Sequence, residues 1–285
     1  MSSKTNTKAH ITFIGGGNMG RALISGLLAN GFDANQISVV EANTATAQNL
    51  QNDFKVQIIN TLENIAFDFA KNNVVVMAIK PQDFNVVAKG LAPKLKHVSA
   101  PSPLVLSIAA GIRLGDMSRW LDQKRCVRAM PNTPALIGKG ITGLFANADI
   151  NADDRALAET ICKAVGQSVW VADEKLMDAV TAVSGSGPAY VFAFLEAMQS
   201  AGEKLGLDTE TARKLAYATL EGATQLAQNS SESAGVLRER VTSKGGTTAA
   251  ALEVLNQDGW HGILEKAIAA ADQRGQVMGD ELGKS

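Results

Sequence analysis

The sequence predicts an α/β domain over residues 1–171 and an all-α domain over residues 172–285. In the first part, short apolar runs alternate with helical patterns, which is typical of a parallel sheet joined by crossover helices. From about residue 172 the strand pattern stops and only helical patterns follow. A glycine-rich turn directly after the first apolar run is the third observation. A chain of 285 residues is long enough for two such domains.

The first apolar run, Ile11–Ile14, leads into a G-x-G-x-x-G pattern and then a helical pattern. In this context Gly15 makes the tight turn, Gly17 admits a pyrophosphate, and Gly20 lets helix and strand pack closely. The amino end of the following helix attracts the phosphates. The pattern therefore predicts a dinucleotide-binding, Rossmann-type domain. Its predicted cofactor contacts in this turn are Gly15, Gly17, Asn18, Met19 and Gly20.

The second apolar run, 37–40, ends in Glu41. This acid lies about 20 residues beyond the third glycine, where a carboxylate binds the ribose hydroxyls. It would repel a 2′-phosphate, and no Arg or Lys occurs between residues 42 and 54, so these residues alone favour NADH. Asn43 and the neighbouring threonines are the polar groups available to hold a phosphate. The choice between NADPH and NADH stays open at this point.

A helix over 44–53 and strands over 56–59, 73–79, 104–108 and 125–129 complete the predicted sheet. Ligands of open α/β sheets bind beyond the carboxyl ends of the strands. The turns that follow these strands therefore line the predicted cofactor crevice.

The composition is that of a packed globular protein, with 46% hydrophobic residues and a net charge of -1. No block of Lys and Arg suggests nucleic acid, and no apolar run approaches the roughly 20 residues of a membrane span. The polar segment 2–8 does not resemble a signal peptide, so we expect a cytoplasmic protein. Cys126 and Cys162 stand far apart, which predicts buried, reduced thiols. No histidine has metal-ligand spacing, so no metal is expected.

The second half predicts helices over 173–182, 190–198, 209–229, 233–241, 247–256 and 259–280, with a break at Ser184–Pro188. The helix Tyr190–Met198 is apolar on nearly every face, and such a helix must be buried all round. A domain of about 110 residues rarely supplies that much cover. We therefore expect a partner subunit over this helix, with a central position in a single bundle as the alternative.

The segment Val241–Thr248 sets Gly245 and Gly246 among hydroxyl side chains, just before a helical run. Glycines let the backbone approach a ligand closely, and the amino end of the helix favours an anion. The pattern predicts a carboxylate or phosphate site. An ordinary helix cap is the alternative, because Ser and Thr cap helices routinely.

Six segments, spread over nearly the whole chain, carry a family resemblance: Phe13–Gly20, Ala78–Pro81, Ser107–Gly111, Arg128–Pro134, Ser184–Tyr190 and Val241–Thr248. In these segments and their order the chain resembles the pyrroline-5-carboxylate reductases. The resemblance implies hydride transfer from NADPH, with NADH as a second cofactor, to the C=N bond of 1-pyrroline-5-carboxylate, giving L-proline. It also implies a homodimer interleaved through the C-terminal dimerisation domain, with a decamer built from dimers as a larger assembly.

The resemblance also assigns roles to residues. The substrate carboxylate meets the backbone N–H groups of Gly245, Gly246 and Thr247 and the hydroxyl of Ser243, while Thr248, the catalytic residue, hydrogen-bonds the ring nitrogen. A dedicated histidine base is not required, and His10, His97 and His261 are expected to be ordinary. The further cofactor contacts are Asn64, on the adenosine side, with Ala78, Lys80, Pro81, Ala109, Ala110 and Gly111.

Two other functions remain open from the residues. One is a different two-domain reductase, of hydroxyacid or ketopantoate type, which needs a Lys or His proton donor. The obvious candidate, Lys204, stands at the far end of its helix, where a cation complements the helix dipole. The other is a non-catalytic dinucleotide-binding sensor, which would have no use for the anion loop.

Overall fold

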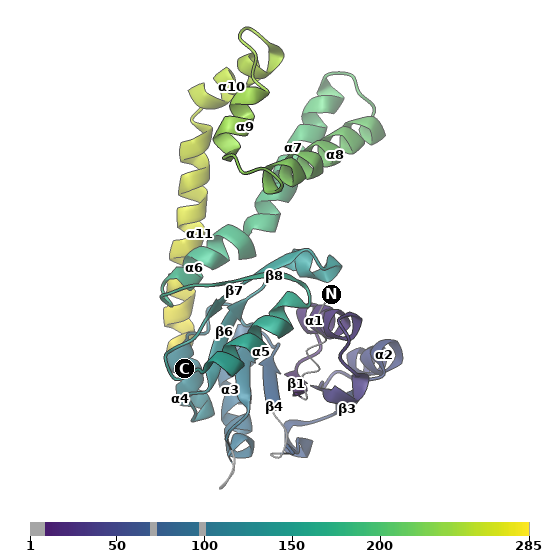
Figure 1. The fold of residues 1–285 in the computed structure, drawn as a ribbon, viewed down its shortest axis with the longest axis vertical. Coiled ribbons are helices and arrows are strands. Elements are labelled where there is room, and N and C mark those ends of the chain that lie inside the picture. The colour runs from purple at the N-terminus through teal and green to yellow at the C-terminus, as the bar shows by residue number, and fades with distance from the viewer. Residues whose placement is uncertain (1–8, 69–72, 97–100, 285) are drawn as a thin grey trace. The chain divides into compact units, whose positions relative to one another are not determined.

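The computed structural model describes residues 9–68, 73–96 and 101–284 and divides into two compact units (Figure 1). The first unit contains Met1–Ser186 and Ala271–Ser285, and the second contains Gly187–Ala270. Packing thus assigns residues 172–186 and the end of the chain to the first unit, whereas the sequence analysis places them in the second domain.

The first unit is built on an eight-stranded sheet in the order β3-β2-β1-β4-β5-β6-β7-β8. The predicted strands, β1–β6, pair parallel with one another, whereas β7 pairs antiparallel with β6 and parallel with β8. The last two strands, β7 and β8, have no counterpart in the sequence prediction. The strands are β1 His10–Ile14, β2 Ile37–Val40, β3 Gln57–Ile59, β4 Asn73–Met77, β5 Leu104–Ser107, β6 Cys126–Met130, β7 Gly140–Phe145 and β8 Gly166–Trp170.

Helices cover both faces of this sheet (Figure 1). Buried side chains of α1 and α5 form one apolar core with the strands, and those of α3 and α4 form a second core on the other face. This two-sided cover explains why the central parallel strands are continuous apolar runs. The helices of the unit are α1 Asn18–Ala29, α2 Thr44–Phe54, α3 Pro81–Leu91, α4 Leu114–Leu121, α5 Ala152–Lys163 and α6 Leu176–Val180.

The predicted break at Ser184–Pro188 is milder than expected. A π-helical turn, Thr181–Gly185, continues directly from α6, and the next helix begins at Gly187. The amide of Ser186 donates to the carbonyl of Thr181 over 2.8 Å, which closes this wide turn. The glycines and proline therefore widen one helical turn where the sequence suggests a loop.

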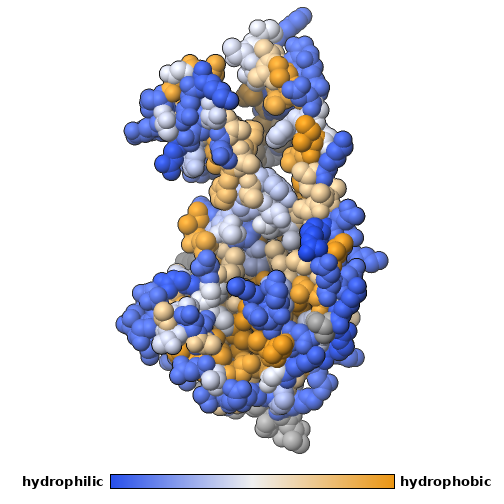
Figure 2. Space-filling view, turned by 180° about the vertical axis from the view of Figure 1, so that it is seen from behind, coloured by the Kyte–Doolittle hydropathy of each residue, from blue (hydrophilic) through white to orange (hydrophobic). Residues whose placement is uncertain are grey.

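The second unit is entirely helical, as predicted. Of α7 only Leu195 is buried, while Val191, Phe192 and Phe194 are 43%, 63% and 38% exposed. Figure 2 shows apolar side chains at the surface among these helices. The unit's own packing therefore leaves α7 largely uncovered. No helix in the described ranges is long and apolar enough to cross a membrane. The helices are α7 Gly187–Lys204, α8 Thr209–Gln228, α9 Ala234–Arg240, α10 Thr247–Gln257 and α11 Trp260–Gly283, whose end belongs to the first unit.

Candidate active site

The glycine turn between β1 and α1 has the geometry that a dinucleotide needs. Gly15 has φ +96°, and a Cβ there would lie 2.5 Å from the carbonyl oxygen of Ala78. A Cβ on Gly20 would lie 2.9 Å from the carbonyl oxygen of Gly15, whereas one on Gly17 would meet nothing within 4 Å. Gly17 is also the N-cap of α1, whose first turn has no acidic residue and no side-chain cap. The turn thus leaves open space and helix amides where a pyrophosphate fits.

Glu41 lies beside this turn, at the carboxyl end of β2. Its Oε2 accepts a hydrogen bond from the Gly16 amide at 2.9 Å, and its Oε1 accepts one from the Asn43 amide at 2.8 Å. The carboxylate therefore fixes the glycine turn whether or not it also meets a ribose. Asn43 has a structural task as well, because its side chain accepts from the Thr46 amide and caps α2.

A groove of about 490 Å³ opens next to Glu41. None of the residues that line it is a Lys or Arg, so a 2′-phosphate there would meet the Glu41 carboxylate and neutral groups, with no cation. The sequence analysis missed Gln48, Gln51 and Asn60, although Asn60 directly follows β3 and strand ends were the signal to read. The lining residues are Glu41, Ala42, Thr44, Ala47, Gln48, Gln51, Ile58 and Asn60.

Most other predicted cofactor residues follow β4, which lies next to β1 in the sheet, and β5, which lies next to β4. The Ala78 amide donates to the Ile14 carbonyl at 2.8 Å, so the end of β4 lies against the end of β1. Lys80 and Pro81 are the N-cap and first residue of α3. The segment that follows β5 contains Ala109, Ala110 and Gly111.

Asn64 is the exception among the predicted cofactor contacts. It lines a separate small pocket together with His10 and Asn73, the first residues of β1 and β4. The structure therefore does not bring Asn64 to the glycine turn, and its cofactor contact stays a prediction.

The predicted anion loop connects α9 to α10 in the second unit. Gly245 has φ +73°, and the amide of Gly246, the N-cap of α10, donates to the Ser243 carbonyl at 3.1 Å. A Cβ on Gly246 would lie 2.4 Å from Ser243 Oγ, so only glycine lets this hydroxyl fold over the loop. Thr247 and Thr248 begin α10, whose first turn has no acidic residue and no side-chain cap. The backbone amides at the amino end of α10 can therefore bind an anion.

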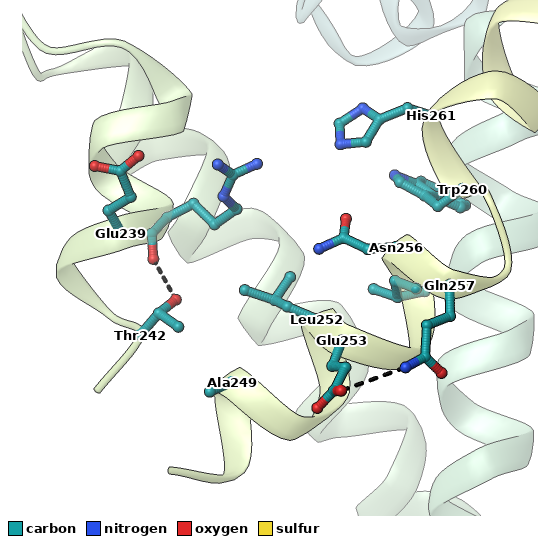
Figure 3. Close-up of a pocket in the computed structure, with 11 residues that line it drawn as sticks. Glu239, Thr242, Ala249, Leu252, Glu253, Asn256, Gln257, Trp260 and His261 are labelled. Atoms are coloured by element: carbon teal, nitrogen blue, oxygen red, sulfur yellow. Dashed lines mark hydrogen bonds between the residues drawn. The ribbon is translucent and has the colours of Figure 1, made fainter. Parts of the chain in front are cut away.

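A pocket of about 620 Å³ lies in the same unit, between α9, α10 and the start of α11. Figure 3 shows Trp260 and His261 on one side of it, with Glu239 and Thr242 on the other. Thr242 of the anion loop lines this pocket, whereas the predicted substrate contacts, Ser243 and Gly245–Thr248, do not. Trp260 also stacks at an angle on Phe194, with ring centroids 6.0 Å apart. Because Leu252 and Trp260 lie among its lining residues, the pocket adds to the incompletely covered apolar surface of this unit.

Elsewhere in the described ranges, the cysteines and the possible metal ligands do not form a second candidate active site. Both cysteines are buried and free, as predicted, and burial raises the pKa of the Cys126 thiol and of the Cys162 thiol to about 12. Both thiols are therefore neutral and unreactive at pH 7. Among the described residues, no group of His, Cys, Asp and Glu has the arrangement of a metal site. His97 and the polar segment 2–8 lie outside the described residues.

Comparison with known proteins finds a matching family for each of the two main parts of the chain. The profile described as pyrroline-5-carboxylate reductase dimerisation matches residues 174–278, and the one described as NADP oxidoreductase coenzyme F420-dependent matches residues 10–111. The chain is 44% identical to a pyrroline-5-carboxylate reductase from Pseudomonas aeruginosa, over 96% of this chain and 98% of the relative. The chain belongs to the pyrroline-5-carboxylate reductase family. An Arabidopsis thaliana member is 34% identical over 94% of this chain and 95% of its own.

Solved structures of the family agree with the fold. A pyrroline-5-carboxylate reductase from Coxiella burnetii superposes with a TM-score of 0.88 at 39% identity, covering 96% of this chain and 99% of its own. A Plasmodium falciparum pyrroline carboxylate reductase with NADP bound gives 0.81 at 29% identity, covering 96% and 98%. Family membership confirms the predicted fold class, the NAD(P)H-dependent reductase activity and the homo-oligomer. It does not favour a hydroxyacid-type reductase or a non-catalytic sensor.

Proposed function

We propose that this chain reduces the C=N bond of 1-pyrroline-5-carboxylate, with the glycine turn binding the cofactor and the Ser243–Thr248 loop binding the substrate. The observation that carries the proposal is the pair of helix amino ends, at α1 and α10, each entered through glycines and free of acidic residues. One suits the pyrophosphate of the cofactor and the other suits the carboxylate of the substrate.

In this proposal the substrate is held by backbone and hydroxyl groups. The amides of Gly245, Gly246 and Thr247 and the hydroxyl of Ser243 bind its carboxylate, and the hydroxyl of Thr248 hydrogen-bonds its ring nitrogen. Fixing the ring in this way supplies much of the lowering of the barrier.

The reduced nicotinamide, when bound, supplies the hydride. The imine carbon of the protonated, iminium form accepts this hydride, and the electron pair of the C=N π bond becomes the lone pair of nitrogen. The immediate product is therefore the neutral secondary amine, which then takes up a proton from solvent, and no dedicated histidine base is needed. The chain's own contribution is to orient the ring and to exclude other geometries.

For the cofactor we propose NADPH, with NADH also accepted. Glu41 and a groove without Lys or Arg weaken the preference for a 2′-phosphate. The proposed contacts are the glycine turn with Glu41 and Asn43, the segment Ala78–Pro81, and the segment Ala109–Gly111.

Two chains contribute to each site in this proposal, because α7 needs a second copy to cover it. Residues 1–171 serve as the cofactor domain, and residues 172–285 serve as the dimerisation and substrate domain. A decamer built from dimers and a cytoplasmic location belong to the same proposal, and size-exclusion chromatography of the native protein tests the assembly.

The direct test of the activity is oxidation of NADPH and NADH with pyrroline-5-carboxylate, with a 2-keto acid, and with neither. We expect oxidation with the imine alone. Oxidation with the keto acid instead would identify a hydroxyacid-type reductase, and no oxidation with any substrate would indicate a sensor.

Complementation tests the shared site. A Gly17→Asp chain, defective in cofactor binding, and a Thr248→Ala chain are mixed in equal amounts and refolded together. If sites combine two chains, half of the dimers are mixed and each has one intact site, so activity returns to about a quarter of the parent level. A mixture no more active than its two components would place each site within one chain.

A further inference from the structure

The carboxyl-terminal end of α11 packs directly on the segment that follows β5. Gly111 has φ +76°, and a Cβ there would lie 2.9 Å from Met278 Cε and 3.2 Å from Leu282 Cδ1. Leu282 also packs against the apolar core formed with α3 and α4. The last two turns of α11 therefore pack on Gly111, where a larger residue would be strained by the positive φ and would displace the end of the Met278 side chain.

Gly279 and Arg113 make the second contact between these segments. A Cβ on Gly279 would lie 3.0 Å from Arg113 Nε and 3.3 Å from the Gly111 carbonyl oxygen. Arg113 Nη1 pairs with Asp280 Oδ1 at 2.7 Å, and its Nη2 donates to the Gln276 carbonyl at 3.2 Å. The guanidinium thus lies against the helix at Gly279, a position without a side chain.

The other end of the same segment is fixed from the sheet and from α6. Glu174 Oε1 accepts from the Leu114 amide at 2.6 Å and from Arg128 Nη1 at 3.1 Å. Arg128 is only 3% exposed and also reaches Asp178 Oδ1 at 3.4 Å. Because the charge of Arg128 is buried, these two carboxylates hold it firmly, and the start of α4 is held with it. The segment between β5 and α4 is therefore fixed at its far end, and α11 sets the position of its middle.

We infer that the last two turns of α11 position the cofactor. The contact of Gly279 and Asp280 with Arg113 and Gly111 sets how far Ala109–Gly111 stand from the carboxyl end of β5, and with it the affinity for NADPH. This inference rests on the proposed cofactor contact of Ala109–Gly111. Arg113, Gly279 and Asp280 are positioning residues, since they act through the segment and need not touch the cofactor. The same helix begins at Trp260 in the second unit, and its end belongs to the first.

The first experiment replaces Gly279 by alanine, with Gly275→Ala as the matched control. A Cβ at 275 would make only ordinary contacts, 3.6 Å from Asp178. Both variants gain helix propensity, so neither is expected to melt at a lower temperature than the parent. We expect Gly279→Ala to raise the NADPH dissociation constant about tenfold by shifting the segment, with kcat and the KM for the imine changed by less than about twofold. Gly275→Ala is expected to bind NADPH like the parent.

An unchanged NADPH dissociation constant in Gly279→Ala would overturn the inference. So would a parallel loss of melting temperature, kcat and both KM values, which would show a purely structural role.

The second experiment compares Asp280→Asn with Glu281→Gln on the parent background. Glu281 pairs with Arg274 on the same helix, at 3.2 Å, and both are exposed. Asp280→Asn is expected to weaken NADPH binding by up to about fivefold, the range of an exposed ion pair, and Glu281→Gln is expected to leave it unchanged. Equal effects of the two variants would refute the role of Asp280. If the parent protein itself bound no NADPH, the proposed function would fail. If the parent bound NADPH and the variants bound it equally well, only the positioning role of α11 would be refuted.

Discussion

Replacing Phe192 by alanine tests whether a second copy of the chain covers α7. In the single chain this ring is 63% exposed, between the half-exposed Val191 and Phe194. Complete burial of a phenylalanine side chain contributes about 1.5–3 kcal/mol, so burial of the exposed part contributes about 1–2 kcal/mol. A symmetric interface contains this ring twice, which doubles the loss to about 2–4 kcal/mol. The dimer dissociation constant should therefore rise about 30- to 1,000-fold.

Sedimentation at a series of protein concentrations measures that constant directly. Val86→Ala is the matched control, because Val86 is 75% exposed on α3 of the first unit, outside the dimerisation unit. Circular dichroism of both variants shows whether the fold is kept. Dimers of Phe192→Ala as tight as those of the parent would refute the reasoning, as would an equal weakening by Val86→Ala.

Three further predictions concern single side chains. Thr248→Ala should lower kcat/KM for the imine roughly 5- to 150-fold, because one hydrogen bond to the reacting group is lost. NADPH binding, measured by fluorescence titration, should stay unchanged, and full activity would remove Thr248 from the mechanism. Glu41→Gln keeps an acceptor for the Gly16 amide but removes the negative charge, so the ratio of kcat/KM with NADPH to kcat/KM with NADH should rise about tenfold. A constant ratio would show that the carboxylate faces away from the ribose. Burial raises the pKa of the Cys126 and Cys162 thiols from 9.0 to about 12, so their contribution to stability is complete below pH 9 and is lost as the pH rises toward 12. At pH 10 the loss is about 1.4 kcal/mol per thiol. Urea unfolding at pH 8 and pH 10 should show this loss in the parent and not in a Cys126→Ala/Cys162→Ala chain, and equal losses in both would contradict it.

The sequence predicted the parallel part of the sheet because those strands are buried on both faces. Val74, Val75 and Val76 have no exposed surface at all, and such runs are read directly from the residues. The strands β7 and β8 escaped notice for the opposite reason. β7 contains two glycines that serve close packing: a Cβ on Gly143 would lie 2.5 Å from Val180 Cγ1 of α6, and one on Gly140 would lie 2.9 Å from Ala135. β8 forms the edge of the sheet and carries polar residues on a half-exposed surface.

The site was predictable where a local pattern carries the function. The two glycine-rich turns lie at helix amino ends, as their spacing implies. The contact between Gly111 and the end of α11 joins residues more than 160 positions apart, and no local pattern signals such a pair. Asn60 and Asn64 show that short turns are also hard to predict. Asn60 lines the groove beside Glu41, whereas Asn64 ends the 3₁₀ turn that follows and lines a different pocket. Residue spacing in the sequence cannot predict a shift of a few residues in such a turn.

The double hydrogen bonding of Glu41 has a consequence for protein engineering. Exchanging the acid at the end of β2 for a small or basic residue is the obvious route to a strict NADPH enzyme. Here the exchange would also strip an acceptor from the amides of Gly16 and Asn43, and the first of these belongs to the glycine turn. Cofactor specificity and the rigidity of the phosphate-binding turn are therefore encoded in one side chain. A redesign must supply a replacement acceptor for the turn in the same round of substitutions that introduces the new charge.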